Sequence, residues 1–191
     1  MRVPQGQRVC GACLREPPPF DQVVAAVDYG FPWSGVIAAF KFHHALDLAP
    51  ALATLLADAV RSNALAWPER LLPVPLSPAR LAERGHNQAW ELTRRMAGLL
   101  ALPATPLVLR RLVDTPHQAD LPRHRRAGNV RGAFGVAPEA SPLLRGRSVA
   151  LIDDVMTTGA TAAEATRVLL AAGASRVQVW VLARTPAPGE G

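Results

Sequence analysis

The apolar positions of this chain occur as short continuous runs and as helical spacings, a pattern typical of an α/β protein. Residues 149–152 form an apolar run, residues 161–172 carry a helical pattern that stops at Gly173, and residues 177–182 form a second run. Two strands joined by a short crossover helix pair in parallel. The pattern therefore predicts a parallel sheet, with its ligand at the carboxyl end of the first of these strands.

The first half of the chain supplies the remaining elements. Apolar runs predict strands at residues 23–29, 71–74 and 107–109. Helical spacing predicts helices at residues 33–42, 46–61 and 87–100. In the second helix six apolar residues share one face: Leu48, Leu52, Leu55, Leu56, Ala59 and Val60. We expect one α/β domain, residues 23–191, with a mostly parallel sheet flanked by helices and a short N-terminal appendage, residues 1–22.

The composition agrees with a folded protein that does not enter a membrane. Hydrophobic residues make up 49% of the chain and charged residues 19%, which is enough to bury a core. No apolar run reaches the roughly 18 residues of a membrane span. Residues 1–7 lack the apolar segment of a signal peptide, so a cytoplasmic protein is expected.

Positive charge is concentrated in the middle of the sequence. The formal net charge is +6, and residues 80–131 alone hold ten Arg against two Glu and two Asp, a difference of +6. Residues 110–132 are rich in Arg, His, Pro and Asp, show no apolar periodicity and are long for an irregular connection. This distribution suits a polyanionic partner, either a pyrophosphate or a nucleic acid. A basic face that only contacts solvent is the alternative.

The carboxyl end of the run 149–152 carries the most informative motif. Asp153 and Asp154 follow the run, and a hydroxyl-rich loop then opens the helix; its residues are Thr157, Thr158, Gly159, Ala160 and Thr161. Glycine lets a ligand approach the backbone, and N–H groups at a helix start attract anions. The loop predicts a phosphate site, and the two acids suit ribose hydroxyls. The alternative is an ordinary strand-to-helix turn with an incidental acidic pair. Neither a GxGxxG motif nor a Walker A loop occurs.

This segment resembles the motif of the type I phosphoribosyltransferases that binds 5-phosphoribosyl-1-pyrophosphate (PRPP). All thirteen positions of residues 149–161 match: four apolar residues, two acids, an apolar pair and a TTGxT loop. The resemblance implies that Asp153 and Asp154 bind the ribose hydroxyls and that residues 157–161 bind the 5′-phosphate. It implies Mg²⁺ as a cofactor, held mostly by oxygens of PRPP. The 6-oxopurine salvage enzymes carry an acid where this chain has Thr157, so a hypoxanthine or guanine transferase is not expected.

From Cys10 to Thr185 the sequence resembles the ComF proteins of bacterial competence. The matching positions are Tyr29, Lys41, Phe42, residues 73–78, Arg80, residues 84–88, Thr115, Gln118, Leu121, Arg126, Asn129 and residues 183–185. This resemblance implies a part in DNA uptake during natural transformation. Its implied partners are single-stranded DNA, the competence helicase and other DNA-uptake proteins.

The resemblance also assigns a pyrophosphate site. The pyrophosphate loop of the family corresponds to four residues: Val74, Pro75, Leu76 and Ser77. Arg80 and Arg84 lie four residues apart at the start of a helix and offer fork-shaped donors to phosphate oxygens. Their alternative is a surface pair with Glu83.

The basic stretch 110–132 takes the place of the mobile lid of related enzymes, which excludes water from the reacting carbon. Four arginines near its end are the expected DNA contacts: Arg123, Arg125, Arg126 and Arg131. A hood that recognises the acceptor is expected within residues 23–61. No general base is evident, and His86 and His117 are candidates by position alone.

Cys10 and Cys13 are the only cysteines and form a CxxC knuckle. Structural zinc needs four ligands, so this pair supplies half a site. ComF proteins usually begin with a four-cysteine zinc element whose second half resembles this one. We interpret the pair as an inert remnant. The alternatives are a reading frame that starts upstream of Met1, additional His ligands, or a zinc shared within a homodimer. A redox CxxC is not favoured, because no thioredoxin-like βαβ pattern follows it.

Three functional classes remain open from the sequence. The first is a phosphoribosyltransferase, a glycosyltransferase acting on PRPP, with an unidentified acceptor. The second is a DNA-uptake factor that uses PRPP binding as a sensor or switch. The third is a salvage enzyme for a nucleobase other than a 6-oxopurine. The first two are compatible, and the sequence favours their combination.

Overall fold

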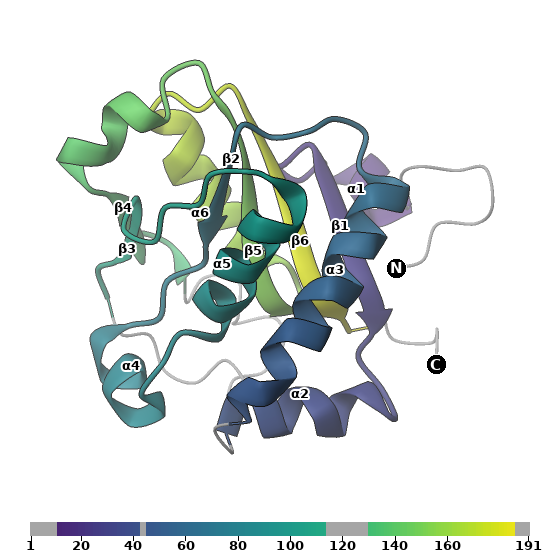
Figure 1. The fold of residues 1–191 in the computed structure, drawn as a ribbon. Helices are drawn as coiled ribbons and strands as arrows, with labels where there is room; N and C mark the ends of the chain where they lie inside the picture. Colours follow the sequence, from purple (N-terminus) through teal and green to yellow (C-terminus); the bar gives the residue numbers. More distant parts are fainter. Residues whose placement is uncertain (1–10, 43–44, 114–129, 186–191) are drawn as a thin grey trace.

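The computed structural model, which describes residues 11–42, 45–113 and 130–185, contains a four-stranded parallel sheet (Figure 1). The strands lie in the order β1 (Gln22–Asp28), β6 (Arg176–Arg184), β5 (Ser148–Met156) and β2 (Arg70–Pro73). All three pairings within this sheet are parallel. The expected parallel sheet is confirmed.

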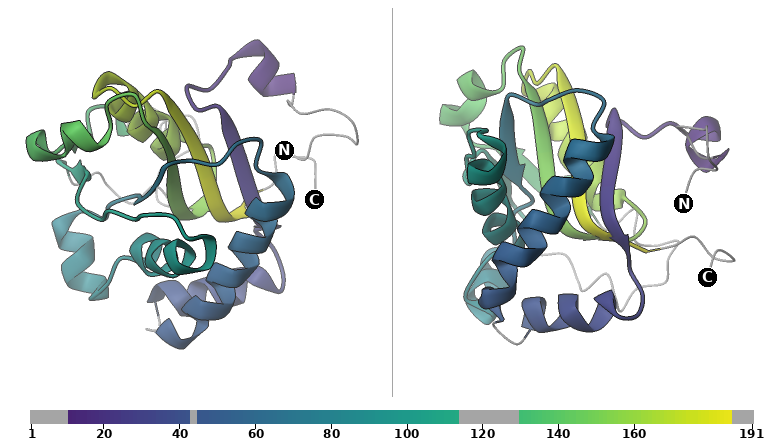
Figure 2. Two further views of the ribbon diagram at one scale, coloured as in Figure 1. Left: turned by 45° about the horizontal axis from the view of Figure 1, so that its top comes forward. Right: turned by 45° about the vertical axis from the view of Figure 1, so that its right-hand side comes forward.

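Helices cover both faces of the sheet (Figure 2). On one face lie α3 (Ala49–Asn63) and α5 (Gln88–Leu100), and on the other lies α6 (Ala160–Ala171). A short antiparallel pair, β3 (Leu109–Arg111) and β4 (Phe134–Val136), packs beside α6. The other helices within the described residues are α1 (Gly11–Arg15), α2 (Trp33–Phe42), η1 (Leu46–Leu48), α4 (Pro78–Arg84) and η5 (Pro138–Leu143). Figure 1 shows α2 and α4 beyond the carboxyl ends of the strands.

The apolar run of β5 is continuous because both of its faces are buried. Val149 and Leu151 pack in the cluster that contains α6, whereas Ala150 and Ile152 pack in the cluster that contains α3 and α5. The apolar face expected on residues 46–61 is also confirmed, since Leu52, Leu56 and Val60 of α3 are buried.

Several element boundaries differ from the sequence-based expectation. The helix expected from residue 46 begins as the 3₁₀ turn η1 and becomes α-helical only at Ala49, with Pro50 in its first turn. Strand β5 continues past the apolar run and includes both acids. Strand β4 was not expected, because three residues give no readable alternation. Within the described residues, no helix is long and apolar enough to cross a membrane.

Candidate functional site

The two acids lie near the carboxyl end of β5 and point to opposite faces of the sheet, as successive strand residues do. Asp154 is buried on the face of α2, α3 and α5, where its Oδ1 lies 3.0 Å from the Nζ of Lys41 on α2. Asp153 is half-buried on the α6 face, beneath the hydroxyl-rich loop. The strand thus presents one carboxylate on each side of its end.

The loop between β5 and α6 depends on Gly159. This residue has φ of +83° and forms the N-cap of α6, where its carbonyl accepts from the N–H of Ala163 at 2.8 Å. A Cβ at this position would lie 2.6 Å from Cε of Met156, in a conformation that L side chains rarely adopt. Thr158 Oγ1 accepts from the N–H of Ala160 at 3.3 Å. Glycine therefore permits the tight turn that brings the loop to the start of the helix.

The loop and Asp153 enclose a small hollow of about 40 Å³. Its lining combines hydroxyls, backbone and apolar side chains: Asp153, Val155, Met156, residues 157–161, Ala162, Val179 and Val181. N–H groups in the first turn of a helix have no partner within the helix, and they favour an anion. Of the residues expected for the ribose and the 5′-phosphate, Asp153 and residues 157–161 line this hollow, whereas Asp154 lies on the other face of β5.

The electrostatic environment of Asp153 is unusual for a carboxylate. Burial raises the pKa of Asp153 to about 7, the neighbouring charge of Asp154 raises it as well, and Lys41 opposes both effects. Asp153 is therefore partly protonated at neutral pH. Its ionised form, which accepts hydrogen bonds from hydroxyls, becomes dominant only above that pH.

The loop expected to hold pyrophosphate lies beside the acids, because β2 is the neighbour of β5. The N–H of Val74 donates to the carbonyl of Ile152 at 2.9 Å. Ser77 is buried and caps α4, its Oγ accepting from the N–H of Arg80 at 3.4 Å. Residues 74–77 thus follow directly from the sheet edge into the first turn of α4.

Residues 84–88 act as a clamp on this loop. Gly85 ends α4 with φ of +72°. Asn87 caps α5, its Oδ1 accepting from the N–H of Ala89 at 3.0 Å, while its Nδ2 donates to the carbonyl of Val74 at 3.1 Å. This segment is one of those that resemble the ComF family, and its physical role in the structure is to join α4, α5 and the 74–77 loop.

Gln88 connects this clamp to α2. Its buried Nε2 donates to the carbonyl of Lys41 at 3.1 Å and lies 3.3 Å from Nε2 of His86. Its Oε1 accepts from Arg84 at 3.3 Å, and the Arg84 guanidinium lies 4.9 Å from the centre of the Phe42 ring. Lys41 and Gln88 were not expected as site residues, because their contacts join segments that are distant in the sequence.

Several expected residues fall outside the part of the chain that the structure describes. Arg123, Arg125, Arg126, His117 and Cys10 lie outside the described residues. Arg131 is exposed, and the N–H of the following Gly132 donates to Glu164 of α6 at 2.7 Å. Among the described residues, no three His, Cys, Asp or Glu side chains gather as a metal site would require.

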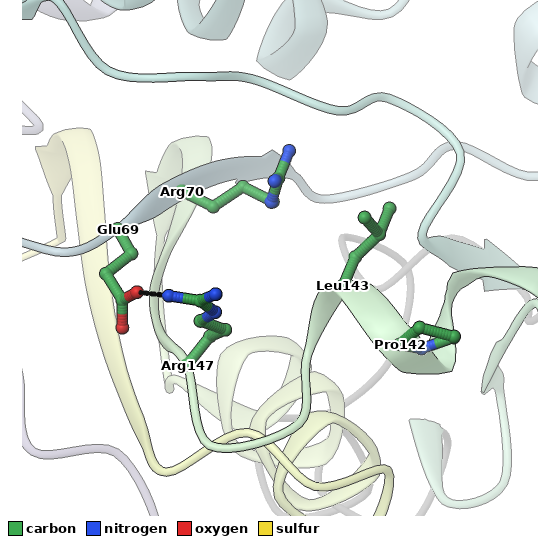
Figure 3. Close-up of a pocket in the computed structure, with 5 residues that line it drawn as sticks. All are labelled: Glu69, Arg70, Pro142, Leu143 and Arg147. Carbon is green, nitrogen blue, oxygen red and sulfur yellow. Dashed lines mark hydrogen bonds and ion pairs between the residues drawn. The ribbon is translucent and has the colours of Figure 1, made fainter.

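A larger hollow, about 260 Å³, lies at the opposite end of the sheet (Figure 3). It is lined by Glu69, Arg70, Pro142, Leu143 and Arg147. Arg147 pairs with Glu69, and Arg70 donates to Thr105 Oγ1 at 2.7 Å. In open parallel sheets ligands bind at the carboxyl ends of the strands. The smaller hollow, where Asp153 and the glycine loop meet, is therefore the candidate functional site.

This fold and this junction define an α/β domain of the phosphoribosyltransferase class, and residues 73–190 match the phosphoribosyl transferase domain family. Competence protein F of Haemophilus influenzae is 37% identical over 179 residues, covering 92% of this chain and 78% of that protein. The DNA utilization protein YhgH of Escherichia coli K12 is 36% identical over 180 residues, with the same coverage. The chain therefore belongs to the family of competence protein F and YhgH.

Among solved structures, the chain is similar to the glutamine PRPP amidotransferase of B. subtilis. The two are 18% identical, with a TM-score of 0.47 over 71% of this chain and 26% of the other.

Proposed function

We propose that this protein binds PRPP at the carboxyl end of β5. The observation that carries the proposal is the junction itself, where two carboxylates stand beside a glycine-centred loop at the start of α6. Asp153 and Asp154 accept hydrogen bonds from the ribose hydroxyls, and residues 157–161 hold the 5′-phosphate. Residues 74–77, with Arg80 and Arg84, hold the pyrophosphate.

Mg²⁺ accompanies PRPP in this proposal. Magnesium prefers oxygen ligands and keeps several waters, so it is usually bound through substrate phosphates rather than by an all-protein cage. The pyrophosphate and ribose oxygens of PRPP supply such ligands next to the 74–77 loop. The carboxylates of β5 remain acceptors for the hydroxyls.

The proposed activity is transfer of the phosphoribosyl group to an acceptor that the site does not name. An alternative is a salvage enzyme for a nucleobase; Thr157, in the position where the 6-oxopurine enzymes carry an acid, argues against hypoxanthine and guanine. A second alternative is a sensor that binds PRPP without turnover. All three share the same PRPP site.

Isothermal titration with PRPP and Mg²⁺ tests the shared site, and saturable binding with one site per chain is expected. A screen of nucleobases for release of pyrophosphate from PRPP then separates the alternatives. Release with one base indicates a salvage enzyme, whereas binding without release for any base favours a sensor or another acceptor. Absence of PRPP binding at millimolar concentration would overturn the proposal.

We further propose a role in DNA uptake, on the basis of the names of the relatives, a competence protein and a DNA utilization protein. The concentration of arginine in residues 80–131 supports direct contact with single-stranded DNA. The contacting residues are Arg123, Arg125, Arg126 and Arg131. The competence helicase and other uptake proteins are the proposed protein partners.

A fluorescently labelled oligonucleotide tests the DNA contact by anisotropy. Each phosphate contact on a single strand adds about 0.7 to the slope of log affinity against log salt, so a few contacts give a slope of roughly −2 to −3. Replacing the four arginines with Ala is expected to flatten this slope. Affinity that is unchanged by the replacement would exclude this surface, and PRPP is expected to compete if the same arginines cover its site.

A further inference from the structure

Lys41 is the only lysine in a chain that uses Arg at its other twenty basic positions. It lies at the last turn of α2, and its ammonium pairs with buried Asp154 at 3.0 Å, with 21% of the lysine side chain and 10% of the aspartate side chain exposed. A lysine carries a compact point charge on a flexible stem, unlike the planar fork of arginine. The only lysine of the chain is thus in contact with one member of the acidic pair, Asp154.

The side chains around Asp153 and Asp154 determine how much the contact with Lys41 matters. On the face of Asp153, the β6 side chains that line the hollow are apolar, namely Val179 and Val181, and the hydroxyls come from the threonines of residues 157–161. Arg184 of β6 is in register with Met156, beyond the pair, and Glu164 of α6 is held by Gly132 and Arg167.

On the other face, Nε2 of Gln88 on α5 donates to the backbone carbonyl of Lys41 at 3.1 Å. The Gln88 side chain also accepts from Arg84 and lies 3.3 Å from Nε2 of His86. Among the described residues, Lys41 is the one cation with an ion pair to either acid.

We propose that Lys41 is a positioning residue for the PRPP site: its ammonium fixes Asp154 and offsets negative charge beside Asp153, so that both side chains are placed to accept hydrogen bonds from the ribose hydroxyls. This inference rests on the proposed PRPP binding. Through its carbonyl, Lys41 is also joined to Gln88 and hence to the 84–88 clamp, so α2 and the pyrophosphate loop share one anchor.

The proposal has a consequence for pH. Asp153 has a pKa raised to about 7, so PRPP affinity is expected to increase as pH rises through 7 and to level off above it. Of the described cations, Lys41 is the one whose charge lowers the pKa of Asp153. Removing that charge must therefore move the midpoint of the pH dependence of PRPP affinity to higher pH. For each pH unit by which the midpoint rises, the ionised fraction of Asp153 falls about tenfold at pH values well below the midpoint.

The test compares PRPP affinity, measured by titration with Mg²⁺ at pH 7, 8 and 9, for wild type, Lys41→Met, Lys41→Arg and Gln88→Met. Lys41→Met is expected to bind about tenfold more weakly at pH 7 and to approach wild type at pH 9. Lys41→Arg retains the charge and should keep the wild-type midpoint. Gln88→Met removes hydrogen bonds of the same anchor without changing a charge, so any loss should be equal at every pH.

The outcomes separate the two proposals. If wild type binds PRPP and Lys41→Met follows the wild-type pH profile, the role of Lys41 is overturned while the PRPP site stands. A loss in Lys41→Met that is equal at all pH values, like that of Gln88→Met, also overturns it and indicates a purely structural contact. If wild type binds no PRPP, both proposals are wrong.

A second measurement avoids the variants. Because Lys41 is the only lysine, acetylation by an amine-reactive ester can be followed on a single peptide by mass spectrometry. Saturating PRPP with Mg²⁺ is expected to slow acetylation of Lys41 several-fold, while labelling of the N-terminal amine serves as the internal control. An unchanged rate at Lys41 would show that the ligand does not cover the pair and would overturn the proposal.

Discussion

Replacing Asp153 and Asp154 together with Asn is expected to abolish the stabilisation of this protein by PRPP. A ligand present at a hundred times its Kd stabilises the folded state by about 2.7 kcal/mol. For a domain of this size that corresponds to a rise in Tm of roughly 5 to 10 °C. The double variant loses both charged acceptors for the ribose hydroxyls, so its Tm should remain unchanged when PRPP and Mg²⁺ are added.

The measurement is a thermal melt at pH 8, above the pKa of about 7 that burial gives Asp153, so that Asp153 is mostly ionised in the wild type. Glu69→Gln is the matched control, since it removes a carboxylate at the opposite end of the same sheet. The control should retain the full shift. Equal shifts in wild type and the double variant would mean that these acids do not hold the ribose.

Gly159→Ala is expected to weaken PRPP binding by a factor of ten or more. The glycine has φ of +83°, a conformation that L side chains rarely adopt, so a Cβ there strains the turn that leads to the start of α6; the end of the Met156 side chain must also shift. A left-handed conformation costs a residue with a Cβ roughly 1 to 2 kcal/mol. Loss of the loop geometry removes N–H donors from the 5′-phosphate in addition to this loss of stability.

Gly146→Ala separates the two effects. Gly146 has φ of +69° with no atom near its missing Cβ, and it precedes β5 at the far end of the strand. Both variants should lose similar stability in a denaturant titration, whereas only Gly159→Ala should lose affinity in an isothermal titration. Unchanged PRPP affinity in Gly159→Ala would remove the loop from the proposed phosphate site.

The sequence was most informative where the structure depends on neighbouring residues. The apolar run of β5, the acids that follow it and the hydroxyl-rich loop lie within one short segment, so their junction was predictable before the fold was known. The start of α3 was predicted three residues too early, because the apolar spacing extends back to residue 46 whereas Pro50 lies in the first turn of the α-helix.

Contacts between distant segments were not predictable. The ion pair between Lys41 and Asp154 and the bond from Gln88 to Lys41 depend on how α2 and α5 pack at the end of the sheet. The 84–88 segment was predictable only in part. Gly85 and Asn87 are typical helix-ending and helix-capping residues, but the bond from Asn87 to Val74 requires the fold.

The pairing of β1 with β6 has a consequence for the synthesis of the protein. The two strands come from opposite ends of the sheet-forming chain, and the N–H of Val177 donates to Asp21, 156 positions earlier. At about 5 to 20 residues per second, a ribosome needs roughly 10 to 30 s to make the intervening segment. Throughout that interval the nascent β1 lacks the strand beside which it belongs. The sheet therefore closes late, and an unpaired strand emerges first, a situation in which chaperones protect nascent chains from aggregation.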